Sequence, residues 1–396
     1  MSKLQELIWE LCPDGVEYKT IQETVGVNRG KRLTKRQLSD DGKYDVYHGS
    51  KDSILGKYTD YNAPGNTVII INTGGIGGVK FLDKPFWCSD GSFWLGQSHY
   101  VNPKYLYYYL AGYEDFFYSQ RRVGGVPTID RSVVEKFEIP IPPLEVQEEI
   151  VRILDHFTNL AAELQAELQA ELQARKEQYE YYRNKLLTFD KIGGGTQSVT
   201  WMKMSEICLN ITSGGTPNTS QKEYYMGNIP WLRTQEVDWH DILDTDMKIS
   251  EEGLKKSSAK MIPINCVIVA MYGATAAKVA INKIPLCTNQ ACCNLEINPQ
   301  KAYYRFVYQW LCKEYGNLRA KGEGSQHNIN SKKIKNYLIP IPSLAEQERI
   351  AAILDRFERL TTDLQIGLPA EIAAVQEQYE YYRNKLLSFP RIKISA

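Results

Sequence analysis

Apolar side chains recur every three or four positions along two stretches of the chain that lie 200 residues apart. In the first stretch they run from Ile150 to Leu172, and in the second from Ile350 to Ile372. This spacing places them on one face of a helix. Prolines directly upstream of each stretch suit a helix start. The pattern therefore predicts two long amphipathic helices, each of about 43 residues and ~65 Å.

The two helical stretches are copies of one another. Residues 139–189 and 339–389 are identical at 31 of 51 positions without a gap, whereas the stretches before them are much less alike. A single exposed helix with one apolar stripe needs a partner, and the other copy can supply it. The repeat predicts a pseudo-twofold molecule in which the two helices form an antiparallel coiled coil. The residues expected to pack along this coil are Ile153, Phe157, Leu160, Leu164, Leu168, Ile353, Phe357, Leu360 and Leu364.

The first helix contains the unit AELQ three times in tandem, at residues 162–173. Each unit adds four residues, which lengthen a helix by ~6 Å and turn it by ~400°, so the same face is nearly kept. The repeat is interpreted as a length adjuster, or else as low-complexity sequence in a good helix former. At the matching place the second copy has Gly367 and Pro369, which predict a kink or an irregular turn.

Outside the helices the pattern changes to short apolar runs bounded by Gly, Asn and Pro. Residues 66–75 (NTVIIINTGG) and 266–275 (CVIVAMYGAT) predict one central buried strand in each half. Each half continues with a segment that begins with cysteine and then with a tyrosine-rich helix, which predicts two related α+β domains. The expected parts are a globular domain (1–143), the first long helix (144–189), a second globular domain (190–343), and the second long helix with the C-terminal tail (344–396).

Charge is divided unevenly between these parts. The chain has 47 basic and 47 acidic side chains, but residues 139–189 hold nine acids against five bases, and residues 190–338 hold 18 bases against 13 acids. The helices are therefore acidic, and any contact with nucleic acid belongs to the globular halves. No apolar run approaches the ~20 residues of a membrane span, and the amphipathic N-terminus is not typical of a signal peptide. We expect a cytoplasmic protein that spans no membrane.

Several loops of the globular halves carry side chains suited to contact DNA. Arginine pairs bidentately with guanine, Gln and Asn pair with adenine, and Lys and backbone amides suit phosphates. The candidates are Arg29, Lys31, Arg32, Lys35, Arg36, Arg121 and Arg122 in the first half, and Ser213, Thr216, Arg233, Thr234, Gln235, Gln326 and His327 in the second. A basic run is more often a solvated loop than a DNA reader, so the pattern alone leaves both interpretations open.

Tyrosines gather in two kinds of place. Tyr105, Tyr107, Tyr108 and Tyr109 at helical spacing favour a core or interface role over a platform for base stacking. Both long helices end in EQYEYYRNKLL, and tyrosine and arginine are typical of protein interfaces. The residues expected to contact a protein partner are Tyr181, Tyr182, Arg183, Tyr381, Tyr382 and Arg383.

The pattern of chemically active residues points to no catalytic centre. The eight cysteines contain no CxxC pair and the five histidines are scattered, so neither a metal site nor a Cys/His nucleophile is expected. Gly74, Gly75, Gly77 and Gly78 favour a tight turn over a phosphate cradle, because no Lys-Ser/Thr follows them. No Walker A motif and no Asn-Pro-Pro-aromatic motif is present.

Over nearly its whole length the chain resembles the specificity (S) subunit of type I restriction-modification enzymes. The resemblance rests on residues 139–157 (IPIPPLEVQEEIVRILDHF), on residues 211–237 (ITSGGTPNTSQKEYYMGNIPWLRTQEV), on CTNQA at 287–291, on the duplicated QYEYYRNKLL and on the AELQ repeat. It implies that each globular half is a target-recognition domain for one half of a bipartite site in double-stranded DNA. It also implies that the coil sets the gap between the half-sites.

The resemblance further implies partners and a division of labour. The chain would dock two DNA methyltransferase (modification) subunits and, through the complex, restriction/motor subunits. It would itself be non-catalytic and bind no cofactor, with S-adenosylmethionine, ATP and Mg²⁺ on the partner subunits. On the residues alone, a coiled-coil scaffold or adaptor that binds no DNA is the alternative.

Overall fold

The computed structural model describes residues 2–122, 124–189, 199–323, 328–362 and 367–392. The chain forms two compact units, Met1–Gln169 with Glu371–Ala396 and Ala170–Ala370. Each unit therefore combines one globular domain with parts of both long helical stretches. Within the described residues, no helix is both long and apolar enough to cross a membrane.

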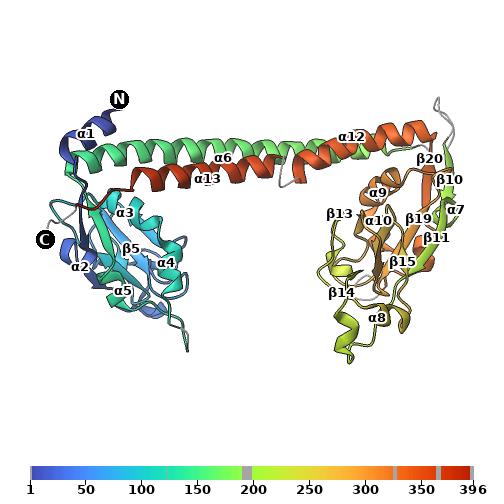
Figure 1. Ribbon diagram of the computed structural model, residues 1–396, viewed down its shortest axis with the longest axis horizontal. Helices are drawn as coiled ribbons and strands as arrows, with labels where there is room; N and C mark the ends of the chain where they lie inside the picture. The colour runs from blue at the N-terminus through green and yellow to red at the C-terminus, as the bar shows by residue number, and fades with distance from the viewer. Residues whose placement is uncertain (1, 123, 190–198, 324–327, 363–366, 393–396) are drawn as a thin grey trace. The chain divides into compact units, whose positions relative to one another are not determined.

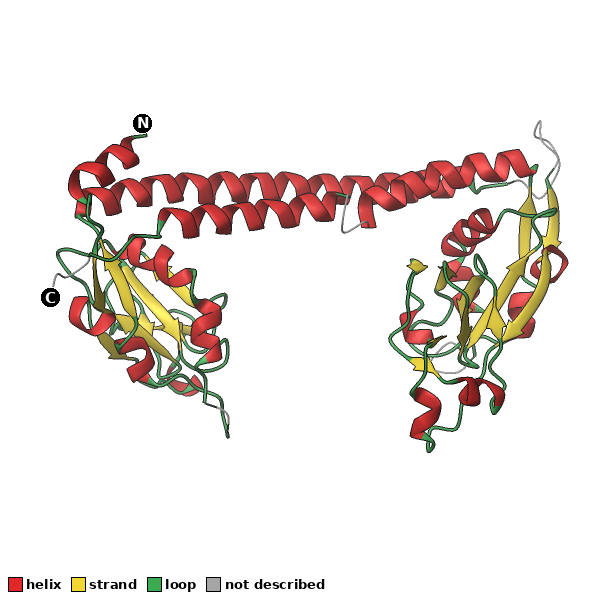
Figure 2. Cartoon of the chain, viewed as in Figure 1, coloured by secondary structure: helices red, strands yellow, loops and turns green. Residues whose placement is uncertain are grey.

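The first helical stretch is one continuous helix, and the second is divided. Helix α6 (Leu144–Leu186) has 43 residues, as the hydrophobic spacing predicts, and the AELQ repeat lies inside it. The second copy forms α12 (Leu344–Thr362) and α13 (Leu368–Leu386), which confirms the predicted break (Figure 2). Pro369 is the second residue of α13, where its missing N–H breaks no helical hydrogen bond. The Gly367 carbonyl accepts a hydrogen bond from the Ala370 amide and starts the new helix.

In the first unit, a four-stranded antiparallel sheet in the order β2-β8-β5-β6 forms the centre of the globular domain. Its strands are β2 (Val27–Arg29), β8 (Ser92–Leu95), β5 (Thr67–Ile71) and β6 (Val79–Leu82). Every residue of β5 is buried, which confirms the strand predicted there. The other strands are β3 (Tyr44–Tyr47), β4 (Gly56–Tyr58) and β7 (Trp87–Cys88) in a second sheet, and β1 (Glu17–Thr20) paired with β9 (Glu138–Ile141).

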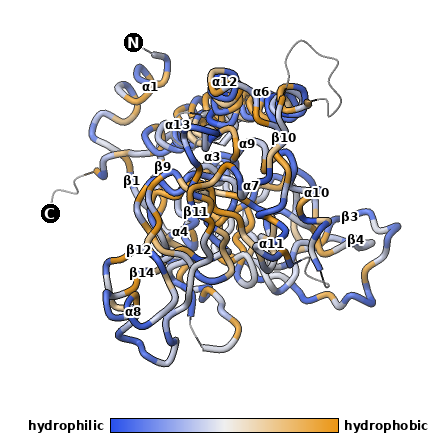
Figure 3. The backbone as a smooth tube through the Cα atoms, turned by 90° about the vertical axis from the view of Figure 1, so that its right-hand side faces the viewer, coloured by the Kyte–Doolittle hydropathy of each residue, from blue (hydrophilic) through white to orange (hydrophobic). Residues whose placement is uncertain are grey.

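Helices cover this sheet and connect it to the helical pair. They are α1 (Lys3–Leu11), α2 (Ile21–Thr24), 3₁₀ helix η1 (Lys35–Gln37), α3 (Pro103–Ala111), α4 (Glu114–Ser119) and α5 (Arg131–Glu135). Helix α3 packs on β5 and β6. Tyr105, Tyr108 and Tyr109 are buried in the core, and Tyr107 is partly buried against it, as the core interpretation of these tyrosines predicts. The amphipathic α1 buries Leu4 in the same core, and its apolar and polar residues alternate along the tube of Figure 3.

The second unit repeats this plan with more strands. Its main sheet has the order β11 (Cys208–Ser213), β19 (Cys292–Ile297), β16 (Val267–Ala270), β17 (Val279–Asn282), β13 (Asp241–Ile242). A second sheet has the order β14 (Lys248–Ile249), β12 (Ile229–Leu232), β18 (Leu286–Thr288), β15 (Met261–Ile262), and β10 (Thr200–Lys203) pairs with β20 (Leu338–Ile341). The helices are α7 (Met204–Ile207), η2 (Lys222–Tyr225), η3 (Thr234–Glu236), α8 (Glu251–Lys255), α9 (Tyr304–Lys313), α10 (Tyr315–Ala320) and α11 (Ser331–Lys335).

The helical stretches pack antiparallel, and the same contact recurs in both units. In the first unit α13 runs beside the first half of α6 (Figure 1), and Phe157 meets Tyr382 at a ring-centroid distance of 6.2 Å. In the second unit Phe357 stacks on Tyr182 at 5.4 Å. Each residue of one pair lies 200 positions from its equivalent in the other. The two units therefore contain the same helix-to-helix contact, as the sequence repeat predicts.

The prediction that Leu160, Leu164 and Leu360 pack along the coil was wrong. Their exposed fractions are 53%, 41% and 37%. The less exposed face of α6 runs instead through Ala161 and Gln165, and the Gln165 amide donates a hydrogen bond to Gln376 on α13. Because successive helical residues differ by ~100° in direction, leucines one position before this face point towards solvent.

The other residues expected along the coil have different places. Phe157, Leu168, Ile353 and Phe357 are half-buried, and Ile153 packs against the core of the first globular domain. Leu364 lies outside the described residues.

Candidate nucleic-acid interface

Most of the predicted DNA-contacting segments meet at one end of the main sheet in each unit. In the first unit Arg29 pairs with Phe93 and Ile71 with Ser92, so β2 and β5 end where β8 begins. In the second unit Ser213 pairs with Cys293 in the same way. Antiparallel pairing thus gathers loops that are distant in the sequence at a single edge.

Hydrogen bonds join these loops into a cluster in the first unit. The Gly75 amide donates to the Gly49 carbonyl at 2.8 Å, and the Ile129 amide donates to the Asn72 carbonyl at 3.2 Å. The Thr73 amide reaches the Gly91 carbonyl at 3.2 Å. We define the first loop cluster as residues 29–37, 48–50, 72–78, 88–92, 121–122 and 124–130.

The second unit has an equivalent set of bonds. The Thr275 hydroxyl donates to the Thr234 carbonyl at 2.8 Å, and the Ile329 amide donates to the Met271 carbonyl at 2.8 Å. The Met271 amide donates to the Ala291 carbonyl, also at 2.8 Å. We define the second loop cluster as residues 213–221, 233–240, 271–277, 288–292 and 328–330.

A glycine and a tryptophan fix the start of the first loop in both clusters. A Cβ on Gly30 would lie 1.9 Å from the Ser89 carbonyl oxygen, and a Cβ on Gly214 would lie 1.9 Å from the Thr288 carbonyl oxygen. Only glycine allows this close approach of the two backbones. The indole N–H of Trp87 donates to the Lys31 carbonyl at 2.7 Å, and that of Trp231 donates to the Gly215 carbonyl at 2.9 Å. The two tryptophans come from non-equivalent strands, β7 and β12, yet they make the same bond.

The backbone of the basic segment in the first cluster is held in place, whereas its basic side chains are exposed to solvent. Arg29 ends β2, and Lys35 and Arg36 lie in η1. All five predicted bases of this segment, including Lys31 and Arg32, are exposed, and within the described residues none has an ion-pair partner. Unpaired exposed cations attract phosphates, so this segment is suited to bind a nucleic-acid backbone.

The two arginines of the hairpin at residues 121–130 are held more tightly. The guanidinium of Arg121 lies 3.9 Å from the Tyr118 ring centroid and donates to the Tyr118 carbonyl at 2.9 Å. Arg122 forms an ion pair with Asp130. Its charge is therefore partly compensated, and its role includes closing the hairpin.

The second cluster is polar rather than strongly basic. Ser213 is exposed at the end of β11, and the Thr216 hydroxyl donates to the Gln290 side chain. Arg233 precedes η3, and its guanidinium meets the carboxylates of Glu236 and Asp246, each at 3.4 Å. Thr234 is half-buried and Gln235 is exposed. Gln326 and His327 lie outside the described residues.

His48 lies inside the first cluster, although it is not among the residues predicted from the sequence. Its Nδ1 atom is 3.2 Å from the Ser89 hydroxyl and 3.3 Å from an Asp90 carboxylate oxygen. A lone histidine between a strand and a glycine gives no distinctive pattern. Only aligning β3 with β12 would have identified it, and these strands share no motif.

The predicted partner-binding residues divide into two groups. Tyr181 and Tyr381 are 58% and 61% exposed, so they are accessible to a partner. Tyr182 and Tyr382 pack against the phenylalanines of the helical pair, and their contact with a partner stays a prediction. The guanidinium groups of Arg183 and Arg383 lie over Tyr179 and Tyr379, at 5.2 and 5.9 Å from the ring centroids.

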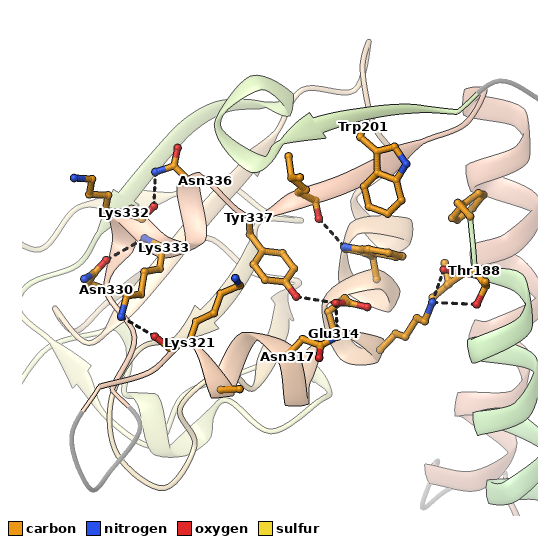
Figure 4. Close-up of a pocket in the computed structure, with 16 residues that line it drawn as sticks. Thr188, Trp201, Glu314, Asn317, Lys321, Asn330, Lys332, Lys333, Asn336 and Tyr337 are labelled. Carbon is orange, nitrogen blue, oxygen red and sulfur yellow. Dashed lines mark hydrogen bonds between the residues drawn. The ribbon is translucent and has the colours of Figure 1, made fainter. Parts of the chain in front are cut away.

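A cavity of about 1000 Å³ lies in the second unit beside α9, α10 and α11 (Figure 4). Trp201 and Trp310 meet edge to face on its wall, at 5.7 Å. Lysines dominate its rim, and among its described lining residues Glu314 is the one carboxylate, which accepts a hydrogen bond from Tyr337 at 2.7 Å. This cleft is cationic and aromatic, and it lacks the paired acidic groups of a hydrolytic site.

The cysteines and acidic residues supply little reactive chemistry. Burial raises the pKa of the Cys88 thiol to about 12, so this thiol is neutral near pH 7 and is a poor nucleophile. Seven of the eight cysteines are buried, and Cys208 is partly buried. In the part of the chain that the structure describes, no group of three His, Cys, Asp or Glu side chains could hold a metal ion.

Comparison with known proteins relates the whole chain to one family. Residues 13–174 and 196–374, well over half of the chain, match the model of the type I restriction modification DNA specificity domain. The EcoR124I/EcoR124II specificity subunit of a type I restriction enzyme from Escherichia coli is 36% identical over 307 residues, which cover 73% of this chain and 71% of the relative. These matches do not support the alternative of a scaffold that binds no DNA.

Two solved structures share the fold. A chain from a type I R-M system matches with a TM-score of 0.70 and 17% identity, covering 95% of this chain and 98% of its own length. The HsdS subunit from Thermoanaerobacter tengcongensis matches with a TM-score of 0.56 and 16% identity, covering 95% and 97%. These likenesses show the architecture of two α+β domains with an antiparallel helical pair.

Proposed function

Because this chain belongs to the family of type I restriction-modification DNA specificity subunits, we propose that each of its globular domains reads one half of a bipartite target in double-stranded DNA. The observation that carries this proposal is the loop cluster. It is built twice, at the same end of two related sheets, from segments that are far apart in the sequence. A rigid scaffold with variable loops at one end is an arrangement that supports sequence-specific binding.

The two clusters differ in the chemistry that they offer to DNA. The first supplies unpaired cations at residues 29–36, which suit phosphates and guanine edges. The second supplies hydroxyl and amide groups around Arg233, whose two carboxylate neighbours hold its guanidinium in place before DNA arrives. Different chemistry at equivalent places supports the reading of two different half-sites. Binding through the first cluster is expected to be the more salt-sensitive.

The helical pair serves as the spacer between the half-sites. Helix α6 is continuous through the three AELQ units, so adding or removing a unit changes its length without breaking it. The break between α12 and α13 lies at the matching place of the other copy.

The exposed tyrosines of the pair support the docking of protein subunits. Tyr181 and Tyr381 are equivalent and present the same surface twice, which suits two copies of one partner. In the proposed complex these partners are two DNA methyltransferase subunits, joined in turn by restriction/motor subunits in the cytoplasm. The chain itself reads DNA and catalyses nothing, and S-adenosylmethionine, ATP and Mg²⁺ act on the partner subunits.

Deleting one AELQ unit, residues 166–169, tests the spacer. The deletion removes ~6 Å of helix, so we expect the gap in the methylated DNA motif to shorten by at most about two base pairs. Both half-sites should stay the same. The control replaces residues 166–169 by AQLE, which keeps the length and should keep the gap. A motif that is unchanged by the deletion would contradict the spacer role.

A further inference from the structure

The two loop clusters place His48 and Arg233 at equivalent positions. Strand β3 runs parallel to β7 with Tyr47 beside Cys88, and β12 runs parallel to β18 with Leu232 beside Thr288. The Ser89 amide, which follows Cys88, donates to the Tyr47 carbonyl at 2.9 Å. The Asn289 amide, which follows Thr288, donates to the Leu232 carbonyl at the same distance. His48 and Arg233 are therefore the first residues after equivalent strand ends.

The residues that follow confirm this equivalence. The Gly49 carbonyl accepts from the Gly75 amide, and the Thr234 carbonyl accepts from the Thr275 hydroxyl, at 2.8 Å in each case. Each bond joins the loop to the turn after the central strand, β5 or β16. The backbone path is thus the same on both sides of His48 and Arg233, and the two side chains leave it from the same place.

His48 is oriented by the turn at residues 89–91. Its Nδ1 atom accepts a hydrogen bond from the Gly91 amide at 3.2 Å and lies 3.3 Å from Asp90 Oδ1. A Cβ on Gly91 would lie 2.7 Å from the same nitrogen, so the glycine leaves room for the ring. The turn therefore fixes the direction of the imidazole through one of its two nitrogens.

The other nitrogen is left for an external partner. Nε2 has no hydrogen bond to any described residue, and 37% of the His48 side chain is exposed. With Nδ1 accepting from the Gly91 amide, the ring places an N–H at Nε2 and can donate from there. The Asp90 carboxylate approaches the Nδ1 side of the ring and leaves Nε2 open. Arg233 also presents a donor group at the edge of its cluster, and two carboxylates hold it there.

We propose that His48 is a specificity-determining residue of the first domain, which reads one base of its half-site through a hydrogen bond from Nε2. The partner is an acceptor on a base edge in the major groove, such as N7 or O6 of guanine, N7 of adenine or O4 of thymine. Asp90 and Gly91 are positioning residues. The proposal rests on the proposed function of the chain as a DNA reader.

Mapping of methylated bases in cells that carry variants of the full chain tests this role. His48→Ala removes the outward donor. His48→Asn keeps an acceptor for the Gly91 amide, but its NH2 group lies closer to the backbone than Nε2 does and falls short of the base. Both variants should lose discrimination at one position of one half-site by about tenfold or more, while the other half-site stays unchanged. Arg233→Ala should alter the opposite half-site. The control is His156→Gln, on the exposed face of α6, which should leave the motif intact.

The results that would contradict the role of His48 differ from the result that would contradict the proposed function. An unchanged motif with His48→Ala would refute a base contact by Nε2. Loss of methylation at all sites in both His48 variants, with normal amounts of the chain, would show that the residue supports the loop rather than reads a base. If the wild-type chain itself directs no motif, the proposed function fails, whatever His48 does.

Discussion

At the residue scale, charged side chains in this protein serve either DNA or the fold, and their partners distinguish the two. Glu149 is a charged residue that serves the fold. Its side chain is 3% exposed and receives two bonds from Arg152, at 2.7 and 3.0 Å, and one from Lys3 at 3.2 Å. These contacts join α1 to the start of α6. The hydrogen bonds from Arg152, and then those from Lys3, lower the pKa of the Glu149 carboxyl to about 2.

The pKa of Glu149 predicts a specific pH dependence of stability. A carboxylate whose pKa is lower in the folded than in the unfolded state stabilises the fold above the unfolded value of about 4.3, and this stabilisation is lost as pH falls towards 2. Glu149→Gln should therefore lower the thermal unfolding midpoint at pH 7, and the difference from the wild type should shrink between about pH 4.5 and 2. Glu148→Gln, at the exposed neighbouring position, is the matched control. Equal midpoints for the two variants at pH 7 would contradict this role.

The exposure of a side chain could be predicted from the sequence where a short local run of residues determines it. The bases at residues 29–36 are exposed as expected, because a dense run of like charges avoids burial. The ion pairs of Arg233 were not predictable, because Asp246 approaches from another strand connection. His48 was missed for the same reason: its partners lie about 40 residues away in sequence, in the turn at residues 89–91.

At the element scale, the presence and length of the long helices were easier to predict than the face on which they pack. The apolar spacing gave the length of α6, and Gly367 with Pro369 gave the break in the second copy. The packing face was wrong at Leu160 and Leu164, because leucines spaced by three and four residues allow more than one stripe. Ala161 and Gln165 occupy the face instead, and neither residue is strongly hydrophobic.

Two substitutions in α6 test this register. Phe157→Ala removes a half-buried ring that meets Tyr382, so it should lower the free energy of unfolding by about 1–3 kcal/mol, less than for a fully buried ring. Leu160→Ala, three residues further on, removes a side chain that is 53% exposed and should change it by about 0.5 kcal/mol or less. Chemical denaturation of the full chain measures both. A larger effect for Leu160→Ala would restore the original prediction of the coil.

At the scale of the whole molecule, duplication made the architecture predictable. Near-identity between residues 139–189 and 339–389 required two equivalent helical environments, and the structure contains them. The ion pairs that join each long helical stretch to its globular domain have nevertheless diverged. In the first unit Lys104 pairs with Asp155 at 2.6 Å, whereas in the second Arg305 binds Asp355, Glu358 and Asp241 together, at 2.8–3.2 Å. Such differences depend on side chains from three elements and have no signature in a single sequence.

In the proposed function, this chain selects the DNA sequence that its complex modifies. The most direct test is to map methylated adenines across the host genome by single-molecule sequencing, with and without the gene for this chain. We expect methylation to vanish on deletion at one bipartite motif with a fixed gap, and to return when the wild-type chain is restored. A methylome in which every bipartite motif survives the deletion would contradict the claim.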